Sequence, residues 1–292
     1  MSIRPRRSVI YMPGANPRAL EKAKSLAADG LIFDLEDAVA PAAKDEAREQ
    51  VCEALRTGGY GARETIIRVN GLATPWGYAD LVAAARAGAD AVLIPKAESA
   101  DMVGQALAVL DGAGAPAELP LWCMVETPRG VLRAEEIASA SPRVRCLVMG
   151  TSDLARELGA SHTATRLPML GALGHCLLAA RACGCAILDG VHLDLQDMAG
   201  FVAVCEQGAE LGFDGKTLIH PRQIETANAA FAPDAGELEL ARRIIEAHAN
   251  ATRQGKGVVV VDGRLIEQLH VDQAQQRVQL ADAIARMSAE TA

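Results

Sequence analysis

The sequence predicts a (β/α)8 barrel, because eight short apolar segments alternate with longer helical segments along the chain. Each apolar segment is four or five residues long and has no polar face, as expected of parallel strands covered by helices. An open, doubly wound sheet is the alternative fold for the same pattern. The predicted strands are Ser8–Met12, Leu31–Leu35, Thr65–Val69, Ala91–Pro95, Leu121–Val125, Cys146–Met149, Ala186–Asp189 and Lys216–Ile219.

The segments between these strands are rich in alanine and carry apolar residues at helical spacing. The predicted helices are Pro17–Ala28, Lys44–Arg56, Gly77–Ala87, Ser99–Leu110, Gly130–Ala140, Leu167–Cys183 and Leu195–Leu211. A long helix, Gly236–Gln254, a short strand, Val258–Val261, and a last helical pattern to about Met287 follow the eightfold alternation. We therefore expect a catalytic barrel over residues 1–232 and a C-terminal extension over residues 233–292.

Composition and charge exclude several classes of protein. The chain has 292 residues, 50% of them hydrophobic, which predicts one large packed core. Its formal net charge of -8 argues against a nucleic-acid partner, since such a protein needs a basic face. No apolar segment approaches the ~20 residues of a membrane span, and the N-terminal one is too short for a signal peptide. The seven cysteines form no Cys-x-x-Cys pair, which favours free thiols in a reducing cytoplasm.

Two of the predicted strands lead into a carboxylate and a helix-start signal. Glu126 stands beside Thr127-Pro128, and Asp153 beside Thr151-Ser152. Parallel strands of a barrel would bring both acids to one rim. Two carboxylates without Cys or His suit a hard cation such as Mg²⁺, and Mn²⁺ accepts the same oxygen ligands. We interpret Glu126 and Asp153 as metal ligands; the alternative is that each is a rim acid in an ion pair or a helix cap.

Other strand ends add charged side chains to the same predicted mouth. Arg68 ends the third predicted strand, close to Glu36 and Asp37 at the end of the second. One of these carboxylates would hold the guanidinium while its fork binds a carboxylate or enolate oxygen of a ligand. Arg68 and Asp37 are therefore candidate catalytic residues, and the alternative is a structural ion pair. The acids expected at the mouth are Asp34, Glu36, Asp37, Glu126, Asp153 and Asp189.

A basic rim is expected on the first two helices, where Arg18, Lys22 and Lys44 could hold phosphates. The alternative is that each is an ordinary surface cation. His220, which follows the eighth strand and precedes Pro221, is interpreted as a hydrogen-bonded histidine at the barrel end rather than a general base.

Eight motifs in order along the chain resemble the citrate lyase β-subunit and malyl-CoA lyase family, in the HpcH/HpaI aldolase superfamily. They are Tyr11-Met12-Pro13-Gly14, Phe33-Asp34-Leu35-Glu36-Asp37-Ala38-Val39, Lys44-Asp45-Glu46-Ala47-Arg48, Ile67-Arg68-Val69-Asn70, Ile94-Pro95-Lys96, Glu126-Thr127-Pro128, Gly150-Thr151-Ser152-Asp153-Leu154 and Gly215-Lys216-Thr217-Leu218-Ile219-His220-Pro221. The resemblance implies a barrel that assembles as a homotrimer or homohexamer, binds Mg²⁺ through Glu126 and Asp153, and places Arg68 at the substrate oxygens.

The same resemblance implies an acyl-CoA substrate and gives further residues a role. Arg18, Lys22 and Lys44 would contact the CoA phosphates. Tyr11 and the segment that contains His220 and Pro221 would lie along the CoA path.

An acidic residue of the C-terminal extension helps to distinguish carbon-carbon cleavage from hydrolysis. Lyases of the family are expected to supply an Asp from this segment, in a neighbouring subunit, as acid or base. Alignment on Gly255-Lys256-Gly257 puts Glu267 at that position, and Asp262 stands nearby. The longer carboxyl of Glu267 disfavours carbon-carbon cleavage and is compatible with hydrolysis.

Over its whole length the chain is most similar to the (3S)-malyl-CoA thioesterase branch. We therefore expect a Mg²⁺-dependent hydrolase of (3S)-malyl-CoA, with Glu267 or Asp262 as the base. One alternative is a malyl-CoA or citramalyl-CoA lyase. The other is a non-catalytic barrel that binds acyl-CoA.

Overall fold

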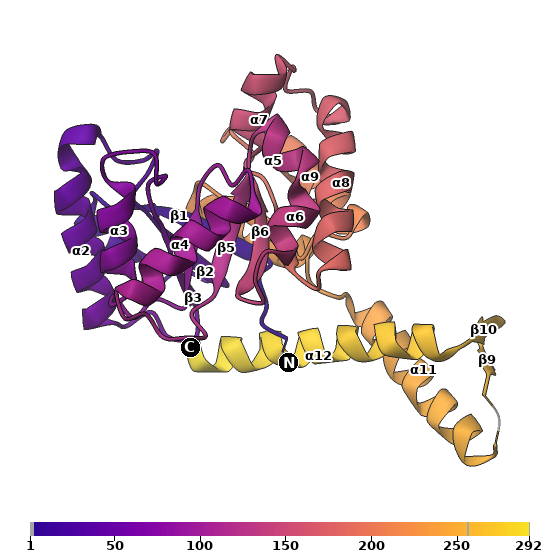
Figure 1. Ribbon diagram of the computed structural model, residues 1–292. Helices are drawn as coiled ribbons and strands as arrows, with labels where there is room; N and C mark the ends of the chain where they lie inside the picture. Colours follow the sequence, from indigo (N-terminus) through magenta and orange to yellow (C-terminus); the bar gives the residue numbers. More distant parts are fainter. Residues whose placement is uncertain (1–2, 256, 292) are drawn as a thin grey trace. The chain divides into compact units, whose positions relative to one another are not determined.

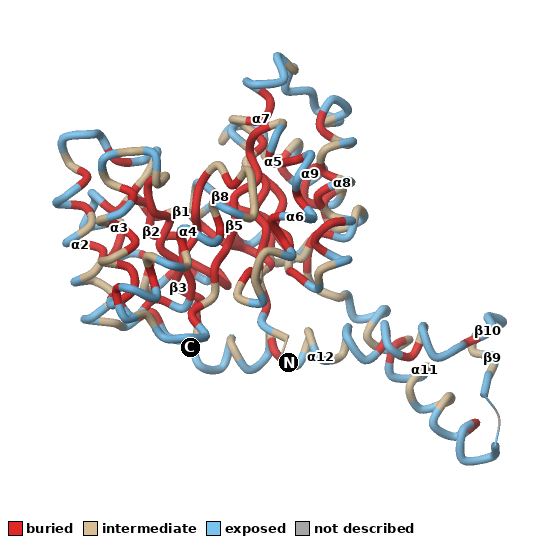
Figure 2. The backbone as a smooth tube through the Cα atoms, viewed as in Figure 1, coloured by how far each residue is buried: buried red, intermediate tan, exposed pale blue. Residues whose placement is uncertain are grey.

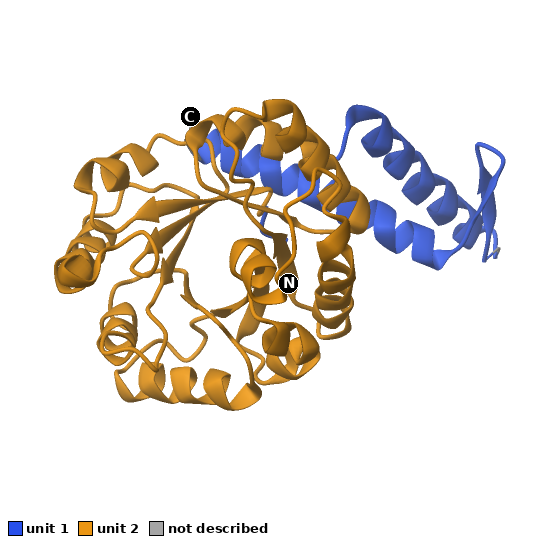
Figure 3. Ribbon diagram, turned by 90° about the horizontal axis from the view of Figure 1, so that it is seen from above, with its two compact units in different colours: residues 1–5, 232–292 blue, residues 6–231 orange. Residues whose placement is uncertain are grey.

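The computed structural model describes residues 3–255 and 257–291, and it contains a closed barrel of eight parallel strands. This confirms the predicted (β/α)8 fold, and the open-sheet alternative is wrong because β1 pairs with β8 as well as with β2. Figure 3 looks onto the ring of strands with its outer layer of helices. The strands are β1 Ser8–Pro13, β2 Gly30–Asp34, β3 Glu64–Arg68, β4 Ala91–Ile94, β5 Leu121–Val125, β6 Val144–Met149, β7 Ala186–Asp189 and β8 Gly215–Leu218.

Some of the helices around the barrel begin at a residue whose side chain caps the first turn. Asn16 accepts hydrogen bonds from the backbone N–H groups of Arg18 and Ala19, and Thr127 accepts one from Gly130 at 3.0 Å. Figure 1 shows the order of these elements. The α-helices are α1 Pro17–Ala23, α2 Lys44–Thr57, α3 Gly77–Ala84, α4 Ala100–Gly112, α5 Pro128–Leu132, α6 Ala134–Ser139, α7 Thr151–Leu158, α8 Leu170–Ala182, α9 Met198–Leu211 and α10 Ile224–Ala230, and the 3₁₀ helices are η1 Pro41–Ala43, η2 Leu167–Met169 and η3 Pro221–Gln223.

Three helical predictions need correction. The single helix expected over Gly130–Ala140 is divided into α5 and α6, because Arg133 between them has a non-helical backbone (φ -114°, ψ 18°). The stretch after β6 contains α7 as well as α8, and α7 ends where Gly159 adopts the left-handed conformation (φ 63°). Helix α10, after η3, was not predicted.

Alternate residues of the strands fill the inside of the barrel, as the two-residue period of a strand requires. The inner cluster consists of Val9, Ile32, Ile66, Ala91, Leu93, Trp122, Met124, Cys146, Val148 and Leu188. Two positions further along four of these strands, on the same inward face, stand Tyr11, Asp34, Arg68 and Glu126. The second core lies between the strands and the helices, and Figure 2 shows the burial of the strand segments in red. The polar mouth is therefore the top layer of the same interior.

The chain divides into two compact units, one formed by residues 6–231 and the other by the described parts of residues 1–5 and 232–292 (Figure 3). The second unit contains helices α11 Ala235–Arg253 and α12 Gln268–Thr291 and the antiparallel hairpin of β9 Val259–Val261 and β10 Arg264–Ile266. Helix α11 begins at a capping box formed by Asp234 and Glu237. No helix in the described ranges is both long enough and apolar enough to cross a membrane.

Strand β10 corrects the expectation of a helical pattern directly after Asp262-Gly263. Both residues of this turn have positive φ, 50° for Asp262 and 77° for Gly263. Two consecutive left-handed residues favour a two-residue hairpin, so the chain returns as a strand before α12 begins.

Candidate active site at the barrel mouth

Arg68 is held at the mouth by Asp34, its direct neighbour in the strand register. The two residues end β3 and β2 and are paired in the ladder. Nε of Arg68 donates to Oδ1 of Asp34 and Nη2 donates to Oδ2, both at 2.6 Å, and both side chains are buried. The sequence prediction did not identify this partner, although the inward period through Ile32 and Ile66 leads to it. One edge of the guanidinium is thus occupied by the protein, and the other edge points to the mouth.

The outer edge of Arg68 contacts the acidic loop that follows β2. Nη1 lies 2.9 Å from Oε2 of Glu36 and 3.3 Å from Oδ2 of Asp37. The ring of Tyr11 stacks on the guanidinium at 4.8 Å, and burial raises the pKa of this tyrosine. The structure therefore brings together four of the candidate residues, Tyr11, Glu36, Asp37 and Arg68. An anionic ligand would meet Arg68 on the side of Glu36 and Asp37.

Glu126 follows β5 on the opposite side of the mouth and is almost completely buried, with a side-chain exposure of 2%. Its Oε1 accepts a hydrogen bond from the backbone N–H of Lys96 at 2.8 Å. Burial raises the pKa of Glu126 to about 7, although the nearby ammonium of Lys96 favours the ionised form. A divalent cation placed at this carboxylate would favour ionisation in the same way.

Space for the Glu126 side chain is provided by Gly150. A Cβ atom at Gly150 would lie 2.3 Å from Cβ and 2.6 Å from Oε2 of Glu126. No L side chain fits there without displacing the carboxylate. The Gly150-Thr151-Ser152-Asp153 motif therefore shapes the position of Glu126 as well as supplying Asp153.

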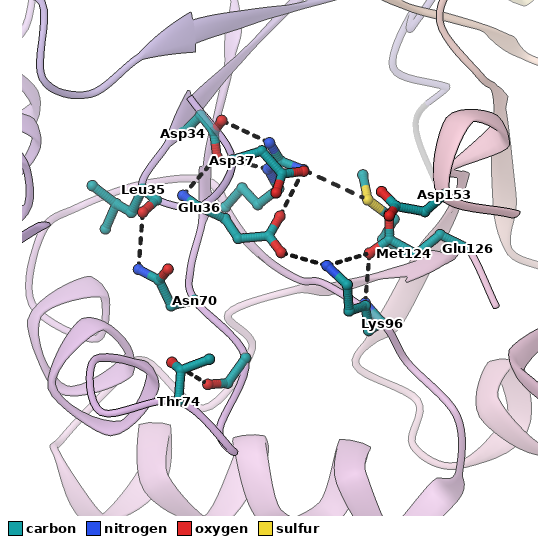
Figure 4. A network of polar contacts seen from close by, with 12 residues as sticks. Asp34, Leu35, Glu36, Asp37, Asn70, Thr74, Lys96, Met124, Glu126 and Asp153 are labelled. Atoms are coloured by element: carbon teal, nitrogen blue, oxygen red, sulfur yellow. Dashed lines mark hydrogen bonds and ion pairs between the residues drawn. The ribbon is translucent and has the colours of Figure 1, made fainter. Parts of the chain in front are cut away.

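Asp153 lies in the first turn of α7 rather than at the end of a strand. Its Oδ1 is 2.5 Å from Nη2 of Arg156, one turn along the same helix. In Figure 4 its side chain points toward Glu126. Among the described residues, no group of three or more His, Cys, Asp or Glu side chains could hold a metal ion. A pair of carboxylates that leaves the other positions to water and substrate fits Mg²⁺, which usually retains several waters.

Lys44 is not part of a surface rim, which corrects the prediction for this residue. It is 5% exposed, and its ammonium donates to the backbone oxygens of Leu35 at 2.8 Å and Glu36 at 2.6 Å. Trp76 covers it at 5.4 Å. The side chain turns inward because the loop after β2 offers these two carbonyls and nearby acids. Lys44 therefore holds the acidic loop, whereas Arg18 and Lys22 on α1 are exposed.

A second support of the acidic loop was also missed by sequence reasoning. Asn70, just after β3, donates through Nδ2 to the Leu35 oxygen at 2.9 Å and to Asp80 at 2.6 Å (Figure 4 shows the first bond). Asp80 is fully buried and also pairs with Arg48 at 3.1 Å. Asn70 and Lys44 therefore fix the backbone of Leu35 from two sides.

Asp189 does not face the mouth, contrary to the expectation. It lies on the outer side of β7, where Oδ2 is 2.8 Å from Nζ of Lys216 and 2.6 Å from Nη1 of Arg166. Its neighbour Leu188 takes the inward position, so the strand period directs Asp189 toward α9. At the end of β8, Nδ1 of His220 accepts a hydrogen bond from the Arg222 backbone at 3.2 Å, and Pro221 begins η3.

The two acids of the C-terminal extension belong to the second compact unit. Asp262 is paired with Arg243 through two hydrogen bonds of 3.0 and 2.7 Å, and both side chains are about half exposed. Glu267 is exposed, and its backbone N–H donates to Nδ1 of His270 at 3.1 Å. Lys256, used to align this segment, lies outside the described residues.

Residues 7–221, which include every strand of the barrel, match the family model described as HpcH/HpaI aldolase/citrate lyase. The chain belongs to the HpcH/HpaI aldolase/citrate lyase family. The resemblance inferred from the motifs is thereby confirmed. The matched region contains the residues of the mouth on both sides of the barrel.

Similarity to individual members of the HpcH/HpaI family extends over almost the whole chain. A (3S)-malyl-CoA thioesterase of Cereibacter sphaeroides (strain KD131 / KCTC 12085) is 54% identical over 286 residues, 98% of each chain. The citrate lyase subunit beta of Escherichia coli (strain K12) is 39% identical, covering 93% of this chain and 91% of the other. The crystal structure of CitE from Mycobacterium tuberculosis with magnesium, acetoacetate and coenzyme A has a TM-score of 0.76 and 31% identity, covering 94% and 97%.

Proposed function

We propose that this protein is a Mg²⁺-dependent enzyme that hydrolyses (3S)-malyl-CoA to malate and CoA. The observation that carries the proposal is the 54% identity to a (3S)-malyl-CoA thioesterase over 98% of both chains. The geometry of the mouth supports it, because two acids and a fixed guanidinium meet at one end of the barrel. A magnesium ion, when bound, would supply Lewis acidity for an oxygen of the substrate.

In this proposal Glu126 and Asp153 hold the metal ion, and Arg68 binds the substrate carboxylate. The paired hydrogen bonds from Arg68 to Asp34 fix the plane of the guanidinium before the substrate arrives. Only the outer edge, next to Glu36 and Asp37, is available to the ligand. Asp37 is the more exposed of these two acids, with 59% of its side chain accessible against 12%, and so is the easier one to displace.

Hydrolysis requires a base near the thioester. The base would take a proton from water while the new carbon-oxygen bond forms, and the carbon-sulfur bond would then break to release the CoA thiol. We assign this role to Glu267, or to Asp262, from a neighbouring subunit of a homotrimer or homohexamer in the cytoplasm. Glu267 is the first choice because its side chain has no ion-pair partner among the described residues, whereas Asp262 is held by Arg243.

The CoA moiety would approach over α1, where Arg18 and Lys22 are one turn apart and exposed. Tyr11 and the His220-Pro221 segment complete the proposed path. Mn²⁺ would replace Mg²⁺ in the assay, because it accepts the same oxygen ligands.

The products of (3S)-malyl-CoA separate hydrolysis from carbon-carbon cleavage. The purified full-length protein is incubated with (3S)-malyl-CoA and Mg²⁺, free thiol is measured with a disulfide reagent, and glyoxylate is trapped with phenylhydrazine. Stoichiometric thiol without glyoxylate is the expected result. Glyoxylate with acetyl-CoA and no free thiol would contradict the proposal.

Carbon-carbon cleavage of malyl-CoA or citramalyl-CoA is the second candidate, favoured by the 39% identity to a citrate lyase subunit beta. A binding barrel without chemistry is a third reading. The joint presence of Glu126, Asp153 and Arg68 at the mouth argues against it, because binding alone does not require this combination.

A further inference from the structure

The ammonium group of Lys96 lies between two acids of the mouth. Its Nζ is 2.7 Å from Oε1 of Glu36 and 3.8 Å from Oε1 of Glu126 (Figure 4). The two carboxylates are 12% and 2% exposed, and the lysine side chain is 41% exposed. Lys96 thus joins the acidic loop after β2 to the strand end of β5.

The backbone of Lys96 takes part in the same arrangement. Its φ is 49°, in the left-handed region that residues with a Cβ rarely adopt. This conformation is accompanied by a hydrogen bond of 2.8 Å from the Lys96 N–H to Glu126. Such a conformation persists where the surrounding structure holds it, and it recurs at functional sites. Lys96 therefore contacts Glu126 through its backbone and faces it with its ammonium.

Arg68 and Lys96, two cations of the mouth, share Glu36 but otherwise pair with different acids. Arg68 is engaged by Asp34, Glu36 and Asp37, all on the side of β2. Within the described part of the chain, the ion pair that Glu126 makes is the one to Lys96. A divalent ion at Glu126 would therefore meet the ammonium of Lys96 as a nearby positive charge.

Glu36 is the second carboxylate that pairs with Lys96. It is a flexible acid on the mouth, and an ion at Glu126 would attract it. The 2.7 Å ion pair with Lys96 and the 2.9 Å ion pair with Arg68 hold Glu36 back. A protein that contributed a third carboxylate would leave fewer positions of the ion for substrate and water.

We propose that Lys96 is a built-in counter-cation of the metal site, which weakens metal binding and keeps Glu36 from becoming a third ligand. This inference rests on the proposed role of Glu126 as a metal ligand. Lys96 is thus a positioning residue that keeps the coordination of the ion open to the substrate. Lys96 lowers the affinity for the metal ion, and the coordination positions that Glu36 would otherwise occupy stay free for substrate and water.

The test measures metal affinity rather than activity. Binding of Mn²⁺ to the full-length protein is followed by electron paramagnetic resonance of the free ion for wild type, Lys96→Met and Lys96→Arg. Lys96→Met should bind Mn²⁺ at least about tenfold more tightly, because removal of an ammonium near a carboxylate strengthens its attraction for a second cation. Lys96→Arg keeps the charge and should stay within about threefold of wild type.

A double variant separates the two parts of the proposal. Adding Glu36→Gln to Lys96→Met should remove a large part of the gain in affinity, since Glu36 can no longer join the ion. Mn²⁺ binding by Lys96→Met that equals wild type or is weaker would overturn the proposal, and so would an equal gain in Lys96→Arg. An unchanged affinity in the double variant relative to Lys96→Met would overturn the role given to Glu36.

Mn²⁺ binding by Glu126→Gln tests the assignment of Glu126 as a metal ligand separately from the role of Lys96. If Glu126→Gln binds Mn²⁺ like wild type, the assignment of Glu126 is wrong. If Glu126→Gln loses binding while Lys96→Met leaves it unchanged, only the inference on Lys96 is wrong. Thermal unfolding of each variant without metal verifies that the fold is intact.

Discussion

Asp34 and Arg68 face each other across two hydrogen bonds of 2.6 Å, between strand ends that are paired in the barrel. Asp34→Asn keeps the shape but removes the charge that fixes the guanidinium. We expect kcat/KM for the CoA thioester to fall about 100-fold, because small displacements of a catalytic group have effects of this size. Asp101→Asn is the control, since that acid is exposed in the first turn of α4. Equal losses in the two variants would contradict the role of Asp34.

Gly150 provides a test of the space around Glu126. A Cβ at this position would lie 2.3 Å from Cβ of Glu126. Gly150→Ala should therefore lower the affinity for Mg²⁺ at least about tenfold, the size of effect seen when support of a metal ligand is lost. Gly171→Ala, on α8, is the control because a Cβ there meets nothing within 4 Å. Isothermal titration with Mg²⁺ measures both, and unchanged affinity in Gly150→Ala would contradict the predicted geometry.

Asp189 is predicted to act in stability rather than catalysis. Asp189→Asn leaves the ammonium of Lys216 buried without a charged partner, so unfolding should become easier by about 3–5 kcal/mol at pH 7. Chemical denaturation measures the change. If Asp189→Asn loses activity without loss of stability, the residue has a role at the site that its position does not suggest.

The stabilisation that Asp189 provides should depend on pH. Burial opposes ionisation of Asp189, but the charges of Lys216 and Arg166 outweigh it and lower its pKa. The stabilisation by this carboxylate is therefore complete above the unfolded value of about 3.9 and is lost as the pH falls through the lower folded value. The difference in unfolding free energy between wild type and Asp189→Asn should shrink below about pH 4. A difference that is constant from pH 7 to pH 3 would contradict this assignment.

Substitution of Arg18 and Lys22 should weaken binding of the CoA moiety, whereas substitution of Lys44 should disturb the acidic loop of the active site. The double variant Arg18→Ala and Lys22→Ala should raise KM for the CoA thioester about tenfold with little change in kcat, and the wild-type KM should rise with salt. Lys44→Met should instead lower kcat, because the carbonyls of Leu35 and Glu36 lose their donor. A truncated pantetheine thioester without the nucleotide phosphates separates the two effects. A KM increase for Lys44→Met alone would support its original assignment to phosphate.

The sequence was sufficient for the barrel and for the gathering of charged residues at one end. The two-residue period that places Ile32 and Ile66 inside the barrel also leads to Asp34 and Arg68, so their pairing was within reach. Asp189 was placed wrongly because a strand end alone does not tell which face a side chain takes. Because Leu188 points into the barrel, the two-residue period of the strand directs Asp189 outward.

Other features depend on contacts that form only in the folded protein. The inward turn of Lys44 requires the carbonyls of Leu35 and Glu36, which only the folded loop presents. The left-handed backbone of Lys96 accompanies its hydrogen bond to Glu126, and the Glu126 side chain fills the space beside Gly150. Spacing along the chain does not indicate these three relationships, because each forms only when the loops and neighbouring strand ends have folded together.

The most direct test of the account is Mg²⁺ binding and turnover by Glu126→Gln and Asp153→Asn. Each substitution removes one charged ligand with little change of volume. Calorimetric titration with Mg²⁺ and the thiol-release assay with (3S)-malyl-CoA should both show losses of more than about 100-fold in each variant, since loss of a ligand exceeds loss of its support. Wild-type Mg²⁺ affinity and turnover in Glu126→Gln would contradict the central claim that a divalent ion is held at the mouth of the barrel.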